Sequence, residues 1–146
     1  MAYRFYGWET ANQKPMNPMY DAVGDPKGLY DLLCRCWTID TCAPRLRENW
    51  SEENRTLGQC SITSFLVQDI FGGQVYGIPL PDGGVHCYNV VDGIAFDLTS
   101  EQFGDTVLCY ENNPVQYRDM HFADRDKKRR YNVLKQSLIK EIAPKE

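Results

Sequence analysis

The dipeptide Asp92-Gly93 lies between two runs in which apolar and polar residues alternate, Gly84–Val91 and Ile94–Thr99. Asp-Gly flanked by such runs is a strong signal for a β-hairpin with a two-residue turn. A turn of this length fixes the register of the two strands, and a slip of one residue would exchange their faces. The chain therefore contains an antiparallel sheet, which restricts the folds open to the rest of the sequence.

The hairpin register assigns every side chain to one of two faces, because side chains alternate along a strand. The first face carries His86, Tyr88, Val90, Ala95, Asp97 and Thr99. The second face is predicted to be core and carries Val85, Cys87, Asn89, Val91, Ile94, Phe96 and Leu98. His86 and Asp97 are diagonal neighbours in this register, about 7–8 Å apart at the backbone. A carboxylate at that position fixes the tautomer of the imidazole and stabilises its protonated form.

An amphipathic helix is predicted immediately before the sheet. Ile62, Phe65, Leu66 and Ile70 recur at helical spacing, and Gly72-Gly73 follow as a helix stop. The helix is expected to begin at Cys60. Free backbone N–H groups and the positive end of the helix dipole favour a thiolate in a first turn. The sequence therefore makes this cysteine a candidate nucleophile.

Together, Cys60, His86 and Asp97 are the three groups of a Cys-His-Asp nucleophilic site. His86 is expected to take the thiol proton and later protonate the leaving group, while Asp97 orients its ring. To bring thiol and ring together, the helix of Cys60 is expected to pack on the His86 face of the sheet. Residue types and spacing leave one alternative open, a structural histidine hydrogen-bonded to Asp97 or Thr99.

Further residues are assigned to the surroundings of the thiol. The backbone N–H of Cys60, together with the side chain of Gln59, is expected to donate to a developing oxyanion. Tyr88, Thr99 and Trp50 are expected to line the cleft.

The remaining elements complete an α+β fold in a single domain, 1–146, with its core at about 25–142. Residues 1–24 are predicted to be irregular, with a short strand at Tyr3–Tyr6. The other predicted elements are a helix at Pro26–Cys36 with Asp25 as its N-cap, a helical turn within Thr41–Trp50, strands at Gln74–Ile78 and Thr106–Tyr110, a turn at Ser100–Gly104, and a last helix at Asp124–Ile142.

The composition excludes several classes of protein. The 146 residues include 42% hydrophobic and 25% charged residues, values typical of a globular domain with a core. The net charge of -4 argues against a nucleic-acid partner. The sequence contains neither a run of about 20 apolar residues nor the apolar segment of a secretion signal, so we expect no membrane partner and a cytoplasmic location.

Six cysteines are present: Cys34, Cys36, Cys42, Cys60, Cys87 and Cys109. In a cytoplasmic protein we expect the five other than Cys60 to be buried, reduced thiols. Zinc binding by Cys34, Cys36 and Cys42 with Cys60, His86 or His121 is the alternative. The spacing lacks the repeated Cys-x2–4-Cys pair typical of zinc sites, so no metal and no cofactor is predicted. The run Arg125–Arg130 is interrupted by aspartate and is expected to be a solvated helix face.

Several short motifs carry a family resemblance. They are Gly58-Gln59-Cys60, Gly72-Gly73, His86-x-Tyr88-Asn89, Asp92-Gly93 and Asp97-Leu98-Thr99-x-x-Gln102-Phe103-Gly104. Over roughly residues 37–104 the chain resembles the small bacterial proteins of the YunG type. Those in turn resemble a minimal papain-like cysteine peptidase fold, also seen in NlpC-type amidases and transglutaminase-like proteins. The resemblance implies that Cys60 is the nucleophile, His86 the base and Asp97 the orienting residue.

The residues and the resemblance lead to one functional expectation. We expect a thiol hydrolase that acts on a peptide- or amide-containing substrate through a thioester at Cys60. An acyl transferase would use the same three groups. One other hypothesis is a binding module that keeps this scaffold without catalysis and binds a peptide or small metabolite in the cleft. Another is a toxin or effector-associated protein of the same fold. The oligomeric state stays open.

Overall fold

The fold combines a small antiparallel sheet with several helices, as a computed structural model describes it for residues 3–144. The strands are β1 (Gln74–Pro79), β2 (Val85–Val91), β3 (Ile94–Phe96) and β4 (Val115–Gln116), in the spatial order β3-β2-β1-β4. The α-helices are α1 (Pro26–Leu33), α2 (Cys60–Phe71), α3 (Arg118–His121) and α4 (Arg125–Ile142). Short 3-10 helices are η1 (Trp8–Thr10), η2 (Pro18–Val23), η3 (Pro44–Asn49) and η4 (Ser100–Phe103). The predicted α+β class is confirmed at this level.

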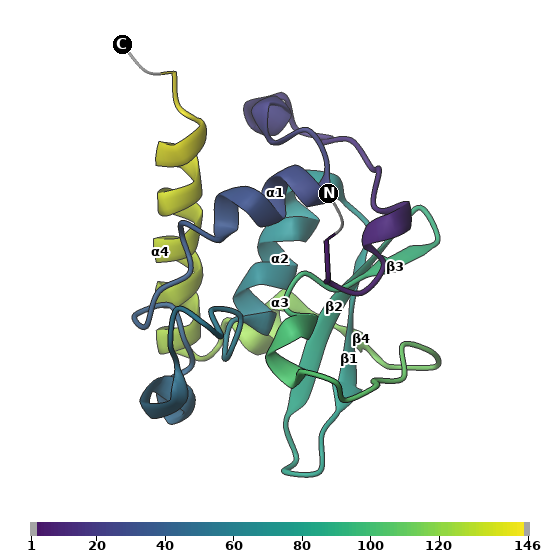
Figure 1. Cartoon of the computed structure of the whole chain (residues 1–146), viewed down its shortest axis with the longest axis vertical. Helices are drawn as coiled ribbons and strands as arrows, with labels where there is room; N and C mark the ends of the chain where they lie inside the picture. Colours follow the sequence, from purple (N-terminus) through teal and green to yellow (C-terminus); the bar gives the residue numbers. More distant parts are fainter. Residues whose placement is uncertain (1–2, 145–146) are drawn as a thin grey trace.

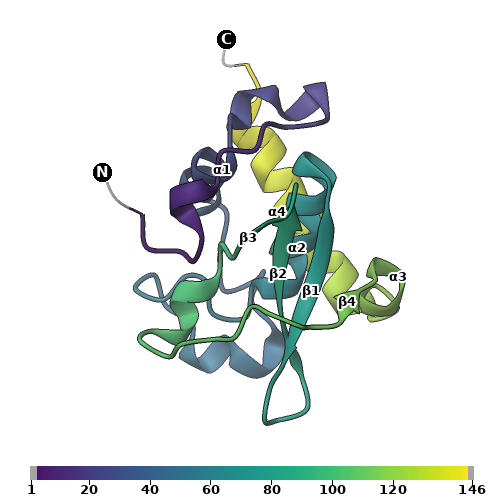
Figure 2. The same ribbon diagram turned by 90° about the vertical axis from the view of Figure 1, so that its right-hand side faces the viewer.

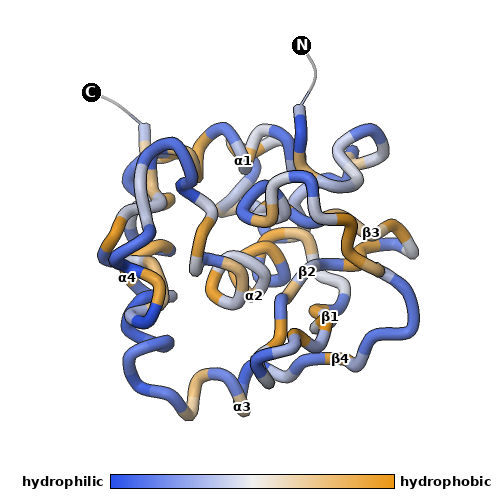
Figure 3. The backbone as a smooth tube through the Cα atoms, turned by 60° about the horizontal axis from the view of Figure 1, so that its bottom comes forward, coloured by the Kyte–Doolittle hydropathy of each residue, from blue (hydrophilic) through white to orange (hydrophobic). Residues whose placement is uncertain are grey.

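Helix α2 occupies the centre of the molecule, between the sheet and α4 (Figure 1). The predicted apolar side is fully buried at Ile62, Phe65, Leu66 and Ile70. Val67 and Phe71 are buried as well, because the helix has packing partners on more than one side. Figure 3 shows hydrophobic stretches in α2 and its neighbouring strands, whereas α4 is mostly hydrophilic. The helix ends, as predicted, at Gly72, whose φ of 81° is readily adopted only by glycine.

The hairpin forms in the predicted register. Val90 pairs with Ala95, and Val91 with Ile94. Both turn residues have positive φ, 53° at Asp92 and 77° at Gly93, as a type I′ turn requires. Strand β3 ends at Phe96, earlier than predicted, since the next residue, Asp97, turns away to pair with Tyr6 of the N-terminal segment.

One prediction about packing was wrong. Helix α2 covers the face of β2 that carries Cys87 and Asn89, not the His86 face. The Asn89 side chain donates to the carbonyl of Ser64 on α2 at 2.9 Å, and Cys87 lies 3.7 Å from the hydroxyl of Ser61. An apolar helix covers the more apolar side of the hairpin because that burial removes the most hydrocarbon from water.

The strand predicted at Thr106–Tyr110 was also wrong. In the described chain these residues lie outside the sheet, and Val107 is 93% exposed. The fourth strand is β4, which pairs with Val75 and Tyr76. A short apolar run alone does not distinguish a strand from a loop whose side chains are held by distant partners.

The predicted N-cap of α1 is present, and α4, which begins one residue later than predicted, also has an aspartate cap. The Asp25 carboxylate accepts from the N–H of Gly28, and that of Asp124 from the N–H of Lys127. Helix α1 ends at Leu33 rather than Cys36. The N-terminal segment contains η1 and η2, and Tyr6 forms a single bridge in place of the predicted strand. Within residues 3–144 no helix has both the length and the apolar character to cross a bilayer.

Candidate active site

The thiol of Cys60 lies at the N-terminus of α2, half-buried at the end of the helix. Its sulfur is 4.0 Å from the carbonyl oxygen of Val85 and 3.9 Å from the hydroxyl of Ser61. No side chain in the described structure caps this helix end. The N–H groups of the first turn therefore lack both an intrahelical carbonyl and a side-chain acceptor, which leaves the positive end of the helix available to a thiolate.

The approach to Cys60 is fixed by Gly58. Its φ is 73°, and a Cβ at this position would stand 2.6 Å from the sulfur of Cys42. Its carbonyl accepts from the N–H of Ala43, and its own N–H donates to Gln102 of η4. The chain is thus held on both sides immediately before the helix begins.

The imidazole of His86 is held by Asp97. The ring Nε2 and the carboxylate Oδ2 are 2.6 Å apart, and both side chains are about 1% exposed. Phe103 of η4 packs edge-on against the ring, with centroids 4.7 Å apart. The other ring nitrogen, Nδ1, has no hydrogen-bond partner among the described residues. A buried nitrogen in this state is available to a neighbouring thiol.

The thiol reaches the ring although α2 packs on the opposite face of the sheet. Strand β3 pairs with β2 only at Asn89–Val91, so the same edge of β2 has no strand partner at Val85–Cys87. The N-terminus of α2 lies at this open end, where Cys60 contacts the carbonyl of Val85. From there it interacts with side chains of both faces, the ring of His86 and the thiol of Cys87.

These contacts set the charge state of the thiol. The Cys87 thiol lowers the pKa of Cys60 as a hydrogen-bond donor, burial raises it, and the nearby imidazole of His86 with its positive charge lowers it further. The result is a pKa of Cys60 well below its ordinary value. The pKa of Cys87 moves the opposite way, well above its ordinary value, because Cys60 carries the charge of the pair.

The imidazole responds in the matching direction. Burial lowers the pKa of His86, but the hydrogen bond to Asp97, the nearby Cys60 thiol and the charges of both groups raise it, to about 10 in total. The two shifts both favour a Cys60 thiolate beside a His86 imidazolium. This is the state in which a thiol attacks a carbonyl carbon and an imidazolium donates a proton.

The carboxylate of Asp97 has partners that the sequence did not reveal. Tyr110 donates its hydroxyl to Oδ2 at 2.7 Å, and Thr99 donates its backbone N–H and its hydroxyl to Oδ1 at 3.2 and 3.3 Å. Tyr110 also stacks on Tyr6, with ring centroids 3.8 Å apart. These contacts fix the carboxylate that orients His86.

The sulfur of Cys60 and the ring of His86 open into one cavity of about 770 Å³. Its walls come from η3, the loop between β1 and β2, η4 and the start of α4. Figures 1 and 2 both show η3, η4 and this loop at the same end of the molecule as the N-terminus of α2.

The described residues that line this cavity include neither Gln59 nor the three residues assigned to the cleft, Tyr88, Thr99 and Trp50. Gln59 is fully buried and donates its amide to the carbonyl of Thr38 at 3.1 Å. Tyr88 donates to the carbonyl of Tyr110, and Trp50 donates to the carbonyl of Arg55.

Comparison with known proteins places the chain in a family. The sequence model of the family described as YunG protein matches residues 25–143, which include Cys60, His86 and Asp97. The chain belongs to the YunG family. It is similar to the Bacillus subtilis (strain 168) protein named uncharacterized protein YunG, with 32% identity over 93 residues, 64% of this chain and 77% of that protein. No solved structure matches the chain.

The other thiols of this YunG chain are free in the structure. Cys36, Cys42 and Cys87 are buried as predicted, whereas Cys34 is half-buried and Cys109 is exposed. The residues the structure describes contain no group of three or more His, Cys, Asp or Glu side chains placed to hold a metal ion.

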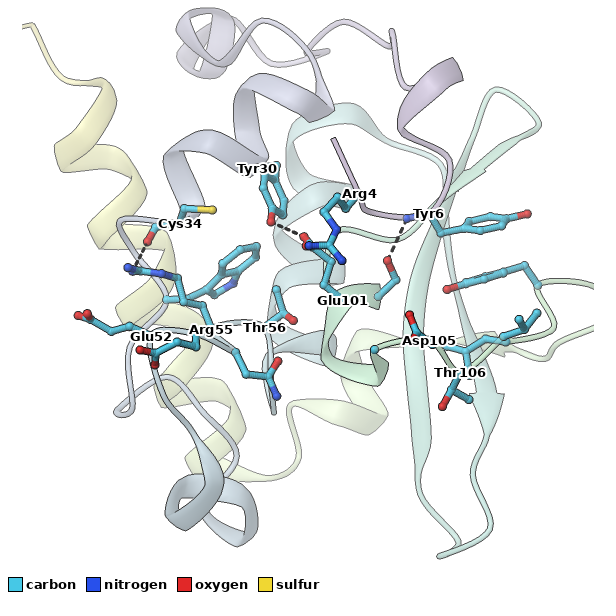
Figure 4. A pocket seen from close by; sticks show the side chains of 18 residues that line it. Arg4, Tyr6, Tyr30, Cys34, Glu52, Arg55, Thr56, Glu101, Asp105 and Thr106 are labelled. Carbon is cyan, nitrogen blue, oxygen red and sulfur yellow. Dashed lines mark hydrogen bonds between the residues drawn. The ribbon is translucent and has the colours of Figure 1, made fainter. Parts of the chain in front are cut away.

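A second cavity, of about 660 Å³, lies on the other side of η4 in this YunG chain (Figure 4). The two cavities share η4 as a wall, because it gives Ser100 and Glu101 to one and Gln102 and Phe103 to the other. In Figure 4 the Tyr30 hydroxyl contacts Glu101. Tyr110 lines this second cavity, so the residue whose hydroxyl donates to Asp97 also forms part of the cavity wall.

Replacing Tyr110 by phenylalanine tests its role as a positioning residue for Asp97. Loss of a hydrogen bond to a carboxylate should lower the free energy of unfolding by about 1–2 kcal/mol, measured by urea denaturation. The pKa of His86, followed by NMR, should also shift, which loss of packing alone would not produce. Tyr117→Phe, which changes a 66% exposed ring, is the matched control. An unchanged pKa of His86 in Tyr110→Phe would contradict the role.

Replacing Cys87 by alanine tests its hydrogen bond to the thiolate. The apparent pKa of Cys60, read from the pH dependence of its alkylation, should rise. At a pH near the native midpoint the alkylation should slow on the order of tenfold, as expected when a hydrogen bond to a charged group is lost. Cys36→Ala, at another buried thiol, is the control. An equal midpoint in both variants would contradict the assigned hydrogen bond.

Proposed function

We propose that this YunG protein is a thiol-dependent amide hydrolase with Cys60 as nucleophile, His86 as general acid and base, and Asp97 as orienting group. One observation carries the proposal. Asp97 holds one nitrogen of a buried imidazole, the other nitrogen has no hydrogen-bond partner among the described residues, and the ring lines the same cavity as a thiol at an uncapped helix end. A histidine with a purely structural role would be expected to have a hydrogen-bond partner at each ring nitrogen.

In the first half-reaction the thiolate of Cys60 attacks the carbonyl carbon of an amide in the cavity. A carbon–sulfur bond forms and the carbonyl oxygen becomes an oxyanion. The free backbone N–H groups of the first turn of α2 are placed to stabilise this oxyanion. The carbon–nitrogen bond then breaks, and the amine leaves with the proton that His86 donates. The product is a thioester at Cys60.

In the second half-reaction neutral His86 takes a proton from water as that water attacks the thioester. The carbon–sulfur bond breaks, the carboxylic acid leaves, and the thiolate–imidazolium pair is restored. An amine in place of water would give an acyl transfer with the same groups. Asp97 keeps its negative charge throughout and stabilises the imidazolium of each resting state.

The architecture supports a papain-like assignment of the fold. The nucleophile begins a central helix, and that helix packs on an antiparallel sheet. The base lies on β2 and the acid directly follows β3, the strand adjacent to β2. This order and placement is what the resemblance to papain-like peptidases implies for Cys60, His86 and Asp97.

Alkylation with iodoacetamide, mapped by mass spectrometry, tests the proposal without knowledge of the substrate. At about pH 6 an ordinary thiol is almost entirely protonated, so only an activated one reacts quickly. Cys60 should react at least about 100-fold faster than exposed Cys109. Slow labelling of Cys60 at the rate of Cys109 would leave a non-catalytic binding module as the better reading.

The pH dependence of the same reaction gives a second expected outcome. The Cys60 thiolate exists above its lowered pKa, so the first rise in alkylation rate should lie well below the pH at which free N-acetylcysteine shows its rise. His86 stays protonated up to a pKa of about 10, and its loss of charge removes the stabilising partner of the thiolate. A second rise should therefore appear near that pH, because a less stabilised thiolate is the stronger nucleophile. A single rise at the pH found for free N-acetylcysteine would contradict the ion pair.

A further inference from the structure

Large apolar side chains that do not belong to the hydrophobic core gather around the thiol. Leu46, Leu57, Leu80 and Phe103 line the cavity of Cys60 and lie outside the core cluster. All four are half-buried, with part of each side chain open to solvent. A fifth, Val85, lines the cavity and also packs against the core. We call these five residues the acyl subsite.

The acyl subsite is assembled from segments far apart in the sequence. Leu46 lies on η3, Leu80 in the loop after β1, and Phe103 on η4. These segments meet at the end of the molecule where α2 begins (Figures 1 and 2). The ring of Phe103 touches the imidazole of His86, so the apolar surface extends to the reacting groups. Apolar surface gathered next to a nucleophile is where the substrate's own apolar surface is removed from water.

The charged residues at the cavity wall already have partners. Arg45 and Asp82 form an ion pair with each other at 3.7 Å. Lys127 contacts Nδ1 of His121 at 2.9 Å, and Asp124 caps α4.

Arg130, the remaining charged residue of the wall, is 4% exposed. It donates to Asp126 at 2.8 Å and to the carbonyl of Thr41 at 3.2 Å. A charged substrate group would have to compete with these existing interactions, whereas an uncharged apolar group needs no new polar partner.

We propose that the acyl subsite selects an uncharged acyl group with a bulky apolar side chain and holds its carbonyl carbon at Cys60. This inference rests on the proposed function and names the substrate class of the same site. A cavity of about 770 Å³ exceeds the volume of one benzyl or isobutyl group, so it also has room for part of the leaving amine.

A matched series of alkylating probes tests the subsite. Iodoacetamide, N-benzyl iodoacetamide and iodoacetate react by the same displacement at carbon but differ in their tails. Rates at Cys60 are divided by those at free N-acetylcysteine, which removes intrinsic reactivity. The benzyl probe should then react about tenfold faster than iodoacetamide, from the apolar area it buries. Iodoacetate should show no such gain.

Substitutions in the acyl subsite test whether its side chains cause the faster reaction of the benzyl probe. The double variant Leu46→Gln with Leu80→Gln should lower the ratio of the benzyl to the iodoacetamide rate toward one. The control Val107→Gln, at a residue 93% exposed and outside this cavity, should keep the native ratio. A native ratio near one, or a ratio unchanged in the double variant, would overturn the acyl subsite. Failure of iodoacetamide itself to select Cys60 would instead overturn the proposed function, so the two failures are distinguishable.

Discussion

Replacing Asp97 by asparagine is expected to destabilise the protein by about 3–5 kcal/mol, the cost of removing one partner from a buried charged pair. Asp97 and His86 are each about 1% exposed, so water does not replace the lost carboxylate. Tyr110 and Thr99 donate to the same carboxylate and would face a side chain with fewer acceptors. Urea denaturation of both proteins at neutral pH measures the difference.

The control for this prediction is Asp105→Asn, which makes the same replacement of a carboxylate by an amide at an exposed residue in the loop after η4. Its free energy of unfolding should stay within about 0.5 kcal/mol of the native value. The pKa of His86 should fall in Asp97→Asn, because the hydrogen bond and charge of Asp97 help to raise it. Equal stabilities of the two variants would show that the carboxylate does not anchor the ring.

Local signals explain which parts of the fold the sequence predicts. The turn residues Asp92 and Gly93 determine the hairpin by their own conformational preferences, so the register of β2 and β3 follows without knowledge of the rest of the chain. Gly72 ends α2 in the same way. Because hairpin alternation also places His86 and Asp97 diagonally, their contact could be predicted from sequence.

Long-range contacts account for what the sequence did not reveal. Tyr110 reaches Asp97 from a loop, and neither its spacing nor its neighbours mark it as a partner of the carboxylate. The access of the Cys60 thiol to the His86 side of the sheet depends on the early end of β3, where Asp97 pairs with Tyr6. The position of Gln59 next to Cys60 suggested an oxyanion donor, but its amide donates to the carbonyl of Thr38 instead.

Replacing His86 by glutamine is expected to slow alkylation of Cys60 about 100-fold at roughly pH 6, because the thiol would return toward the ordinary pKa of cysteine. Glutamine can hydrogen-bond but carries no proton to exchange and no positive charge. The hydrogen bond from Cys87 and the helix end remain, so the residual reactivity should not fall below that of Cys109.

The only other histidine in the sequence supplies the matched control for this replacement. His121 lies on α3, does not line the cavity of Cys60, and is hydrogen-bonded to Gln116 and Lys127. His121→Gln should keep the native alkylation rate of Cys60. Circular dichroism of both variants separates loss of reactivity from loss of folding. A folded His86→Gln protein that alkylates at the native rate would mean that the helix end and Cys87 alone activate the thiol. The imidazole would then have no part in deprotonating it, and a catalytic role for the Asp97–His86 pair would have to be abandoned.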